Sequence, residues 1–226
     1  IPTGDTASIP IGVHPNGLAF ARGRLHVLLG NLAPCQPGGL CPLGNSSVVV
    51  VDPFAFARAG GVDSIPLPGE GNARFLRGEP DGFLYVMSEG NQDEPGRLAI
   101  VDPVRRQEIG NFGGFGLVPG RFTVDGTTRI LVTSMANGLM EFDTRTRTVT
   151  RGVGSSIPVD RASGVAVDSR GLVYAVETGP CDGVSPGRLR IYLPGLTERR
   201  SVFLGGCATG ALVALVPPSL VAPTSR

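Results

Sequence analysis

The feature that most constrains the fold is a strand-like segment that recurs along the whole chain. Each copy begins with a small or polar residue and continues with alternating apolar positions. The copies start 43 to 56 residues apart: "NGLAF" from Asn16, "NARFL" from Asn72, "GRFTV" from Gly120, "SGVAV" from Ser163 and "TGALV" from Thr209. Alternation of apolar and other residues is typical of half-buried strands. We therefore expect one strand at each copy.

Three further strand-like segments follow each of the first four copies. The second segments span 23–31, 82–91, 128–137 and 171–179; the third, 46–53, 96–103, 138–144 and 187–194; the fourth, 62–68, 106–112, 146–152 and 197–206. Glycine and proline separate them, and no stretch shows useful helical periodicity. Four short strands per unit, at a period near 45 residues, indicate the blades of a small β-propeller.

The two ends of the chain predict how the propeller closes. The unit that starts at Thr209 is too short for four strands, and "DTASIPIG" (5–12) is similar to the fourth segment "VDSIPLP" (62–68). An N-terminal strand that completes the last blade would close the ring and remove two sheet edges. We expect one all-β domain, 1–226, of about five blades: 13–68, 69–114, 117–154, 158–206, and a composite blade of 207–226 with 1–12.

Composition excludes several classes of function. Charged residues make up 17% of the chain and the net charge is +1, so no basic stripe favours binding to nucleic acid. No apolar run reaches the length of a membrane span. The chain contains 34 glycines and 20 prolines, as expected for many short strands joined by turns. We therefore expect neither nucleic acid as a partner nor a transmembrane segment.

Four cysteines predict two disulfides. None of them lies in a CxxC motif, and wide spacing with only two histidines argues against a zinc cluster. Cys35 and Cys41 lie in one long loop, whereas Cys181 and Cys207 lie in loops of neighbouring blades at the same end. We predict the pairs Cys35–Cys41 and Cys181–Cys207, and hence an oxidising, periplasmic or secreted environment.

One segment also resembles a known group of propellers. "GVAVDSRGLVYAVETG" (164–179) is similar to the repeat of the NHL, SMP-30 and strictosidine-synthase-like propellers, and "HPNGLAFARGRLHVLLGN" (14–31) is a weaker copy. The resemblance implies the architecture. It does not choose a function, because these families include lactonases, synthases and interaction platforms.

The repeat predicts which residues surround the mouth of the central channel. Asn16, Asn72, Ser163 and Thr209 occupy equivalent positions before the innermost strand, with Gly120 in the third blade and with Arg74 and Arg121 nearby. Glu89 and Glu177 follow the second strands at the same end. These residues are our candidates for a ligand-binding channel mouth.

The resemblance also implies an alternative function for the channel mouth, the binding of a metal ion. SMP-30-type lactonases hold one divalent cation such as calcium with glutamate, asparagine and aspartate side chains, and Glu89, Glu177, Asn16 and Asn72 could supply such a set. Glu89 and Glu177 would then serve a metal-dependent hydrolase. The early Glu-Gly-Pro segment of these enzymes is missing. Hydrogen-bonded loop ends around a water-filled channel are the other interpretation.

Our leading hypothesis is a non-catalytic binding protein. His26 alternates within a strand and His14 precedes a proline at a turn, so a serine–histidine–aspartate triad is not expected. The long loop 30–46 contains Leu32, Leu40 and Leu43, which favour a contact with another protein if they are exposed. We expect an extracytoplasmic accessory subunit of a larger membrane-associated complex, which binds other protein subunits through its long-loop face.

Overall fold

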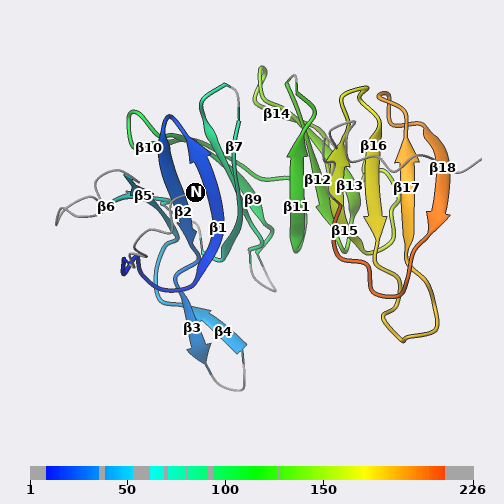
Figure 1. The fold of residues 1–226 in the computed structure, drawn as a ribbon, viewed down its shortest axis with the longest axis horizontal. Coiled ribbons are helices and arrows are strands. Elements are labelled where there is room, and N and C mark those ends of the chain that lie inside the picture. Colours follow the sequence, from blue (N-terminus) through cyan, green and yellow to red (C-terminus); the bar gives the residue numbers. More distant parts are fainter. Residues whose placement is uncertain are drawn as a thin grey trace, which may run out of the picture.

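The fold is all-β. In the computed structural model, residues 9–35, 39–52, 62–68, 71–79, 81–90, 94–126 and 128–211 are described. They form four antiparallel sheets of four strands each and one two-stranded hairpin. Figure 1 shows the four sheets side by side as successive blades. The described part of the chain contains no helix with the length and apolarity needed to span a bilayer.

The strands follow the predicted repeat, and in each sheet their spatial order is their chain order. The first sheet contains β1 (Pro15–Ala21), β2 (Arg24–Leu29), β5 (Ser47–Val51) and β6 (Val62–Pro66). The second contains β7 (Ala73–Gly78), β8 (Leu84–Ser88), β9 (Arg97–Asp102) and β10 (Gln107–Phe112). The third contains β11 (Pro119–Val124), β12 (Arg129–Ser134), β13 (Gly138–Asp143) and β14 (Thr148–Arg151). The fourth contains β15 (Ala162–Val167), β16 (Val173–Glu177), β17 (Arg188–Tyr192) and β18 (Glu198–Phe203).

The core lies between neighbouring sheets. The first and second sheets pack through residues that include Leu28, Val48 and Leu84, and the second and third through Met87, Phe115 and Phe142. A third cluster, with Leu131, Val173 and Tyr192, joins the third sheet to the fourth. The middle strands β5 and β8 are buried at nearly every position, so they are apolar along almost their whole length rather than at alternate positions.

The innermost strands of successive sheets contact one another: β1 with β7, β7 with β11, and β11 with β15. This arrangement is consistent with a propeller of about five blades. The predicted fifth blade, 207–226 with 1–12, lies mostly outside the described residues. Of its N-terminal part, Ile9 and Ile11 are described, and both pack against the outer face of the first sheet.

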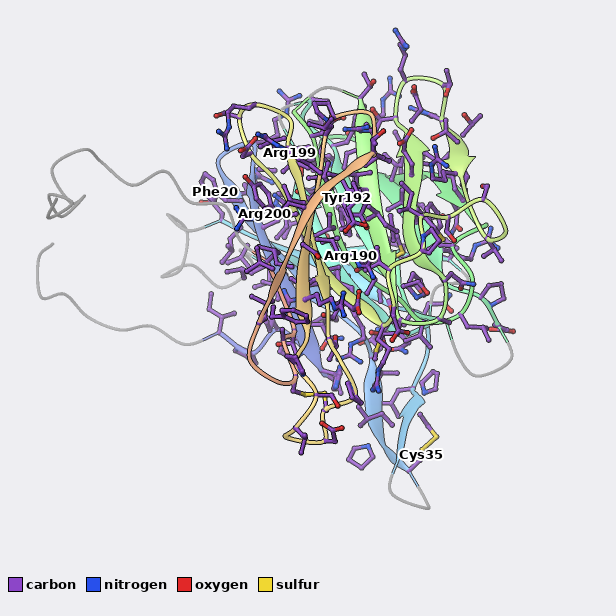
Figure 2. All side chains as sticks on the ribbon, turned by 90° about the vertical axis from the view of Figure 1, so that its right-hand side faces the viewer. Phe20, Cys35, Arg190, Tyr192, Arg199 and Arg200 are labelled. Atoms are coloured by element: carbon purple, nitrogen blue, oxygen red, sulfur yellow. A yellow bond between two sulfur atoms is a disulfide. The ribbon has the colours of Figure 1, made fainter. Side chains whose placement is uncertain are left out.

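One element was not predicted. Residues 30–46, expected as a loop without secondary structure, contain a hairpin of β3 (Leu32–Cys35) and β4 (Gly39–Pro42). Its register pairs Leu32 with Pro42 and Cys35 with Gly39. Figures 1 and 2 both show this hairpin extending below the body of the blades.

Candidate functional site

Each innermost strand begins with the same backbone pattern at the lower end of the blades in Figure 1. A residue with positive φ comes first, and a β-bulge follows within three residues. The positive-φ residues are His14 (58°), Asn72 (57°), Val118 (49°) and Arg161 (47°). The bulges fall between Pro15 and Gly17, Ala73 and Phe75, Pro119 and Phe122, and Ala162 and Gly164. This pattern fixes which side chains are equivalent between blades.

The pattern corrects one predicted equivalence. Asn72 occupies the place of His14, not that of Asn16: the amide of Gly30 donates to the carbonyl of His14, as the amide of Glu89 donates to that of Asn72. The residue in the bulge, equivalent to Asn16, is therefore Arg74. The alignment of the repeats matched Asn16 with Asn72 because both are asparagine. Nothing in the sequence shows where a bulge inserts its extra residue.

Residues 207–211 follow the fourth blade and resemble the start of a further innermost strand; we call this place the fifth inner position. Cys207 has a positive φ of 59°, like the four residues above. The Ser163 hydroxyl donates to the carbonyl of Ala208 over 3.0 Å, as the Asn16 amide donates to that of Ala73 over 3.0 Å. Asn16 and Ser163 therefore each tie the start of one blade to the start of the next. Thr209 follows and is exposed.

A cavity of about 290 Å³ lies among these inner strands. It is lined by residues of β1, β7, β11 and β15 and by Ala211. Of the predicted channel-mouth residues, the structure brings Asn16, Arg74 and Arg121 together in its wall. Asn72, Ser163, Thr209, Glu89 and Glu177 are not part of its described lining.

Three arginines contribute to this cavity: Arg74, Arg77 and Arg121. Arg74 forms an ion pair with Glu89, with Nη1 and Oε2 2.9 Å apart. Arg77 forms an ion pair with Glu79, with Nε and Oε1 3.1 Å apart. Burial raises the pKa of Glu79, and the charge of Arg77 opposes that rise.

The third arginine has a different environment. The guanidinium carbon of Arg121 lies 5.8 Å from the centre of the Phe75 ring, a cation–π arrangement. Among the described residues no carboxylate forms an ion pair with Arg121. Among the arginines that line this cavity, Arg121 is thus the one whose charge no described acidic side chain balances.

The two carboxylates considered for a metal already have protein partners. Glu89 accepts from Arg74, and Glu177 accepts from Nε of Arg190 at 2.6 Å. The Asn72 amide donates to the carbonyl of Gly90. In the described part of the chain, no group of three or more histidine, cysteine or acidic side chains is placed to hold an ion.

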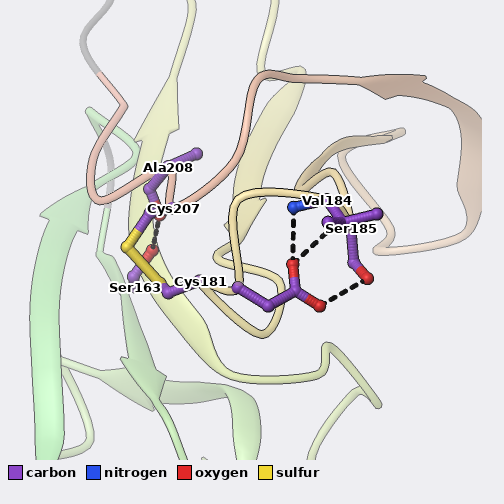
Figure 3. The surroundings of a disulfide bond; sticks show 7 residues. Ser163, Cys181, Val184, Ser185, Cys207 and Ala208 are labelled. Carbon is purple, nitrogen blue, oxygen red and sulfur yellow. Dashed lines mark hydrogen bonds between the residues drawn. A yellow bond between two sulfur atoms is a disulfide. The ribbon is translucent and has the colours of Figure 1, made fainter.

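Both predicted disulfides are present at the long-loop end. Cys35 pairs with Cys41, and Cys181 pairs with Cys207. Figure 3 shows the second disulfide beside the bond from Ser163 to Ala208, so two contacts hold the start of the fifth inner position against the fourth blade. In the same loop Asp182 accepts from the amides of Val184 and Ser185, which stabilises the turn.

The hairpin carries exposed apolar side chains beside its disulfide, which Figure 2 marks at Cys35. Leu40 is 52% exposed and Leu43 is 65% exposed. Leu32 differs from the expectation: it is 5% exposed, because it lies at the base of the hairpin where β3 joins the body. The two histidines lie where the sequence placed them: His26 is buried in β2, where desolvation lowers its pKa, and His14 forms the turn before β1.

Sequence reasoning missed Phe75 and Arg77 as cavity residues. Strict alternation along a strand places Arg74 and Arg77 on opposite faces, since they are three residues apart. The bulge at Arg74 resets the alternation, so both can line one cavity. A repeat alignment that allowed one extra residue per inner strand would have found them.

The comparison with solved structures found a protein with a similar fold. A structure of Kuenenia stuttgartiensis hydrazine synthase is similar over 91% of this chain and 53% of that chain, with a TM-score of 0.57 and 18% sequence identity. At this identity the likeness shows the fold alone, and the chain spans about half the length of that protein. No family model and no curated protein sequence matches.

Proposed function

We propose that this chain is a non-catalytic, extracytoplasmic β-propeller that binds another protein through its long-loop end, as an accessory subunit of a larger assembly. The observation that carries the proposal is the β3–β4 hairpin. It extends from the body, a disulfide closes it, and Leu40 and Leu43 are exposed on it. A hairpin fixed in this way loses little conformational freedom on binding, which favours its use as a contact.

The surrounding surface supports this use. The β16–β17 loop lies at the same end and carries Val184, which is 87% exposed. Two disulfides, one on each of these loops, indicate an oxidising compartment. A hydrolase of the lactonase type would instead need Glu89 and Glu177 free for an ion, and each accepts a hydrogen bond from an arginine.

Copurification from the native host tests the proposal. The tagged full chain should retain one partner at a fixed stoichiometry, and Leu40→Ser with Leu43→Ser should remove it. Such a double change at the centre of an interface typically costs more than about 2 kcal/mol of binding free energy, or about thirtyfold in affinity. Val104→Ser is the matched control, because Val104 is 70% exposed at the opposite end, in the β9–β10 turn.

Two results would contradict the proposal. One is a chain that purifies as a clean monomer from the host under mild conditions. The other is a partner retained equally by the wild type, the Leu40/Leu43 variant and the Val104 variant, which would place the contact elsewhere.

A further inference from the structure

The central cavity has an unbalanced charge. Three guanidinium groups contribute to its wall and no aspartate or glutamate is among its described lining residues. Glu89 and Glu79 pair with Arg74 and Arg77, which leaves the charge of Arg121. In a partly enclosed site an uncompensated cation attracts an anion more effectively than it would on an open surface.

Arg121 lines this cavity and is exposed, so its donors are accessible to a ligand. Its guanidinium carbon lies 5.8 Å from the centre of the Phe75 ring, and its Nε lies 3.8 Å from the point where a Cβ on residue 210 would lie. A guanidinium is a planar group whose N–H donors match the two oxygens of a carboxylate. The contact with Phe75 favours a position of this group beside the cavity.

The cavity wall combines apolar and polar groups. Leu76, Phe122, Val165 and Ala211 line it together with the ring of Phe75, beside Asn16 and the three arginines. The volume of about 290 Å³ is at the small end of the range of roughly 300–1,000 Å³ for ligand pockets. Apolar side chains beside the guanidinium of Arg121 favour a small ligand with an apolar body and one anionic group.

We infer that the channel binds a small organic carboxylate, with Arg121 as the main anion-binding residue and Phe75, Phe122 and Val165 against the apolar body. Arg74 and Arg77 are occupied by their ion pairs with Glu89 and Glu79, so they are not the main anion-binding groups. This inference goes beyond the proposed protein contact. It concerns a small-molecule site formed by the inner strands, not the hairpin surface.

Isothermal titration of the intact, oxidised chain with benzoate at low ionic strength tests the inference. Benzamide is the matched control ligand because it has nearly the same shape and no charge. Benzoate should bind with a stoichiometry of one, and benzamide should bind at least about tenfold more weakly, since the charge-assisted bonds to Arg121 are lost. Added salt should weaken benzoate binding.

Two variants of Arg121 locate the site. Arg121→Gln should reduce benzoate affinity by about tenfold or more, and Arg121→Lys should cause a smaller loss, because lysine keeps the charge without the planar pair of donors. Arg199→Gln is the control: Arg199 is an exposed arginine on the outer strand β18, labelled in Figure 2. Its affinity for benzoate should equal that of the wild type.

Several results would overturn the inference: no benzoate binding to the folded wild type, equal binding of benzamide, or equal losses in the Arg121→Gln and Arg199→Gln variants. Circular dichroism and thermal unfolding confirm that each variant is folded. The Leu40/Leu43 serine variant should bind benzoate normally. Failure of the carboxylate site therefore leaves the partner contact untouched, and failure of the partner contact leaves the site untouched.

Discussion

The two ends of the blades are stabilised in different ways. At the upper end in Figure 1, the turns that the structure describes completely are short and closed by local hydrogen bonds. At the lower end the chain forms the β3–β4 hairpin, both disulfides and the starts of the inner strands beside the arginine-lined cavity. We call these the turn end and the loop end.

At the turn end, aspartates satisfy backbone amides within a few residues. Asp102 accepts from the amides of Val104 and Arg105, and Asp143 accepts from those of Arg145 and Thr146. These hydrogen bonds lower the pKa of both carboxyl groups. Every partner lies within three residues, so each turn is specified by its own sequence.

At the loop end, the stabilising contacts join residues far apart in the chain. Asn16 bonds to Ala73, Ser163 bonds to Ala208, and Cys181 is joined to Cys207. Contacts between blades occur at the turn end too, where Arg106 pairs with Asp63 and Arg129 donates to the carbonyl of Pro194. The loop end differs in that a covalent bond, Cys181–Cys207, holds the fourth blade to the next inner position. Because its loops are free to vary around that scaffold, the loop end is where we place both proposed contacts.

The largest expected effect comes from removing the disulfide that joins the fourth blade to residues 207–211. Cys181→Ser with Cys207→Ser should lower the free energy of unfolding by about 3–4 kcal/mol, because the bond closes a loop of 26 residues in the unfolded chain. Urea unfolding under oxidising conditions measures the change.

Cys35→Ser with Cys41→Ser is the comparison within the same end. That disulfide spans six residues of a hairpin outside the main body, so its loss should cost no more than about 2 kcal/mol. If the two double variants lost the same free energy of unfolding, the Cys181–Cys207 bond would stabilise the protein no more than a disulfide within one short loop.

A second prediction concerns how closely the inner strands approach one another. A Cβ at position 164 would lie 2.6 Å from Cα of Gly210 and 2.8 Å from the nitrogen of Ala211. Gly164→Ala should therefore force these backbones apart and destabilise the chain by about 1–3 kcal/mol, as measured by thermal unfolding. The effect should be absent if residues 210–211 do not lie against β15 in solution.

Gly195→Ala is the control for this change. No atom lies within 4 Å of a Cβ built at Gly195, so alanine there should be neutral or slightly stabilising. A loss as large as that of Gly164→Ala would show that the cost comes from losing glycine as such, and not from the approach of the strands.

The contrast between the ends also explains how much the sequence could predict. The second, third and fourth strands of the first four units fall within the predicted segments, and the first strands overlap theirs but extend beyond them, because alternation and glycine-rich turns are local signals. The place of His26 within a strand followed from alternation, but its burial did not, because β2 is buried at four consecutive positions. Both disulfide pairs were also predicted, since the repeat places Cys181 and Cys207 in neighbouring blades at one end.

The site was harder to predict because its geometry depends on long-range register. The bulge at Arg74 moved Asn72 out of the expected ring and placed Arg77 in the cavity wall. Leu32 is buried by the body of the protein rather than by its own neighbours in sequence. The ion pairs of Glu89 with Arg74 and of Glu177 with Arg190 depend on strand pairing, which residue types alone do not reveal.

The smallest expected effect concerns Asp168 at the turn end. Asp168 lies in the turn between β15 and β16. Desolvation raises its pKa, but bonds from Arg170, the Leu172 amide and Tyr174 outweigh this and lower the pKa from 3.8 to about 2. Because the folded pKa is depressed, the stability that Asp168 contributes is complete above about pH 4 and lost as the pH falls through 2.

Asp168→Asn should therefore have a lower melting temperature than the wild type at pH 7. The difference between the two melting temperatures should become smaller as the pH approaches 2. The control is Asp182→Asn, since Asp182 makes similar bonds in a turn of the loop end and its pKa is also lowered. Asp182 accepts from Val184 and Ser185, whereas Asp168 also accepts from the side chains of Arg170 and Tyr174, so the Asp182 variant should lose less stability than Asp168→Asn at pH 7. A difference between Asp168→Asn and the wild type that is the same at every pH would mean that the carboxylate charge has no part in stabilising the turn.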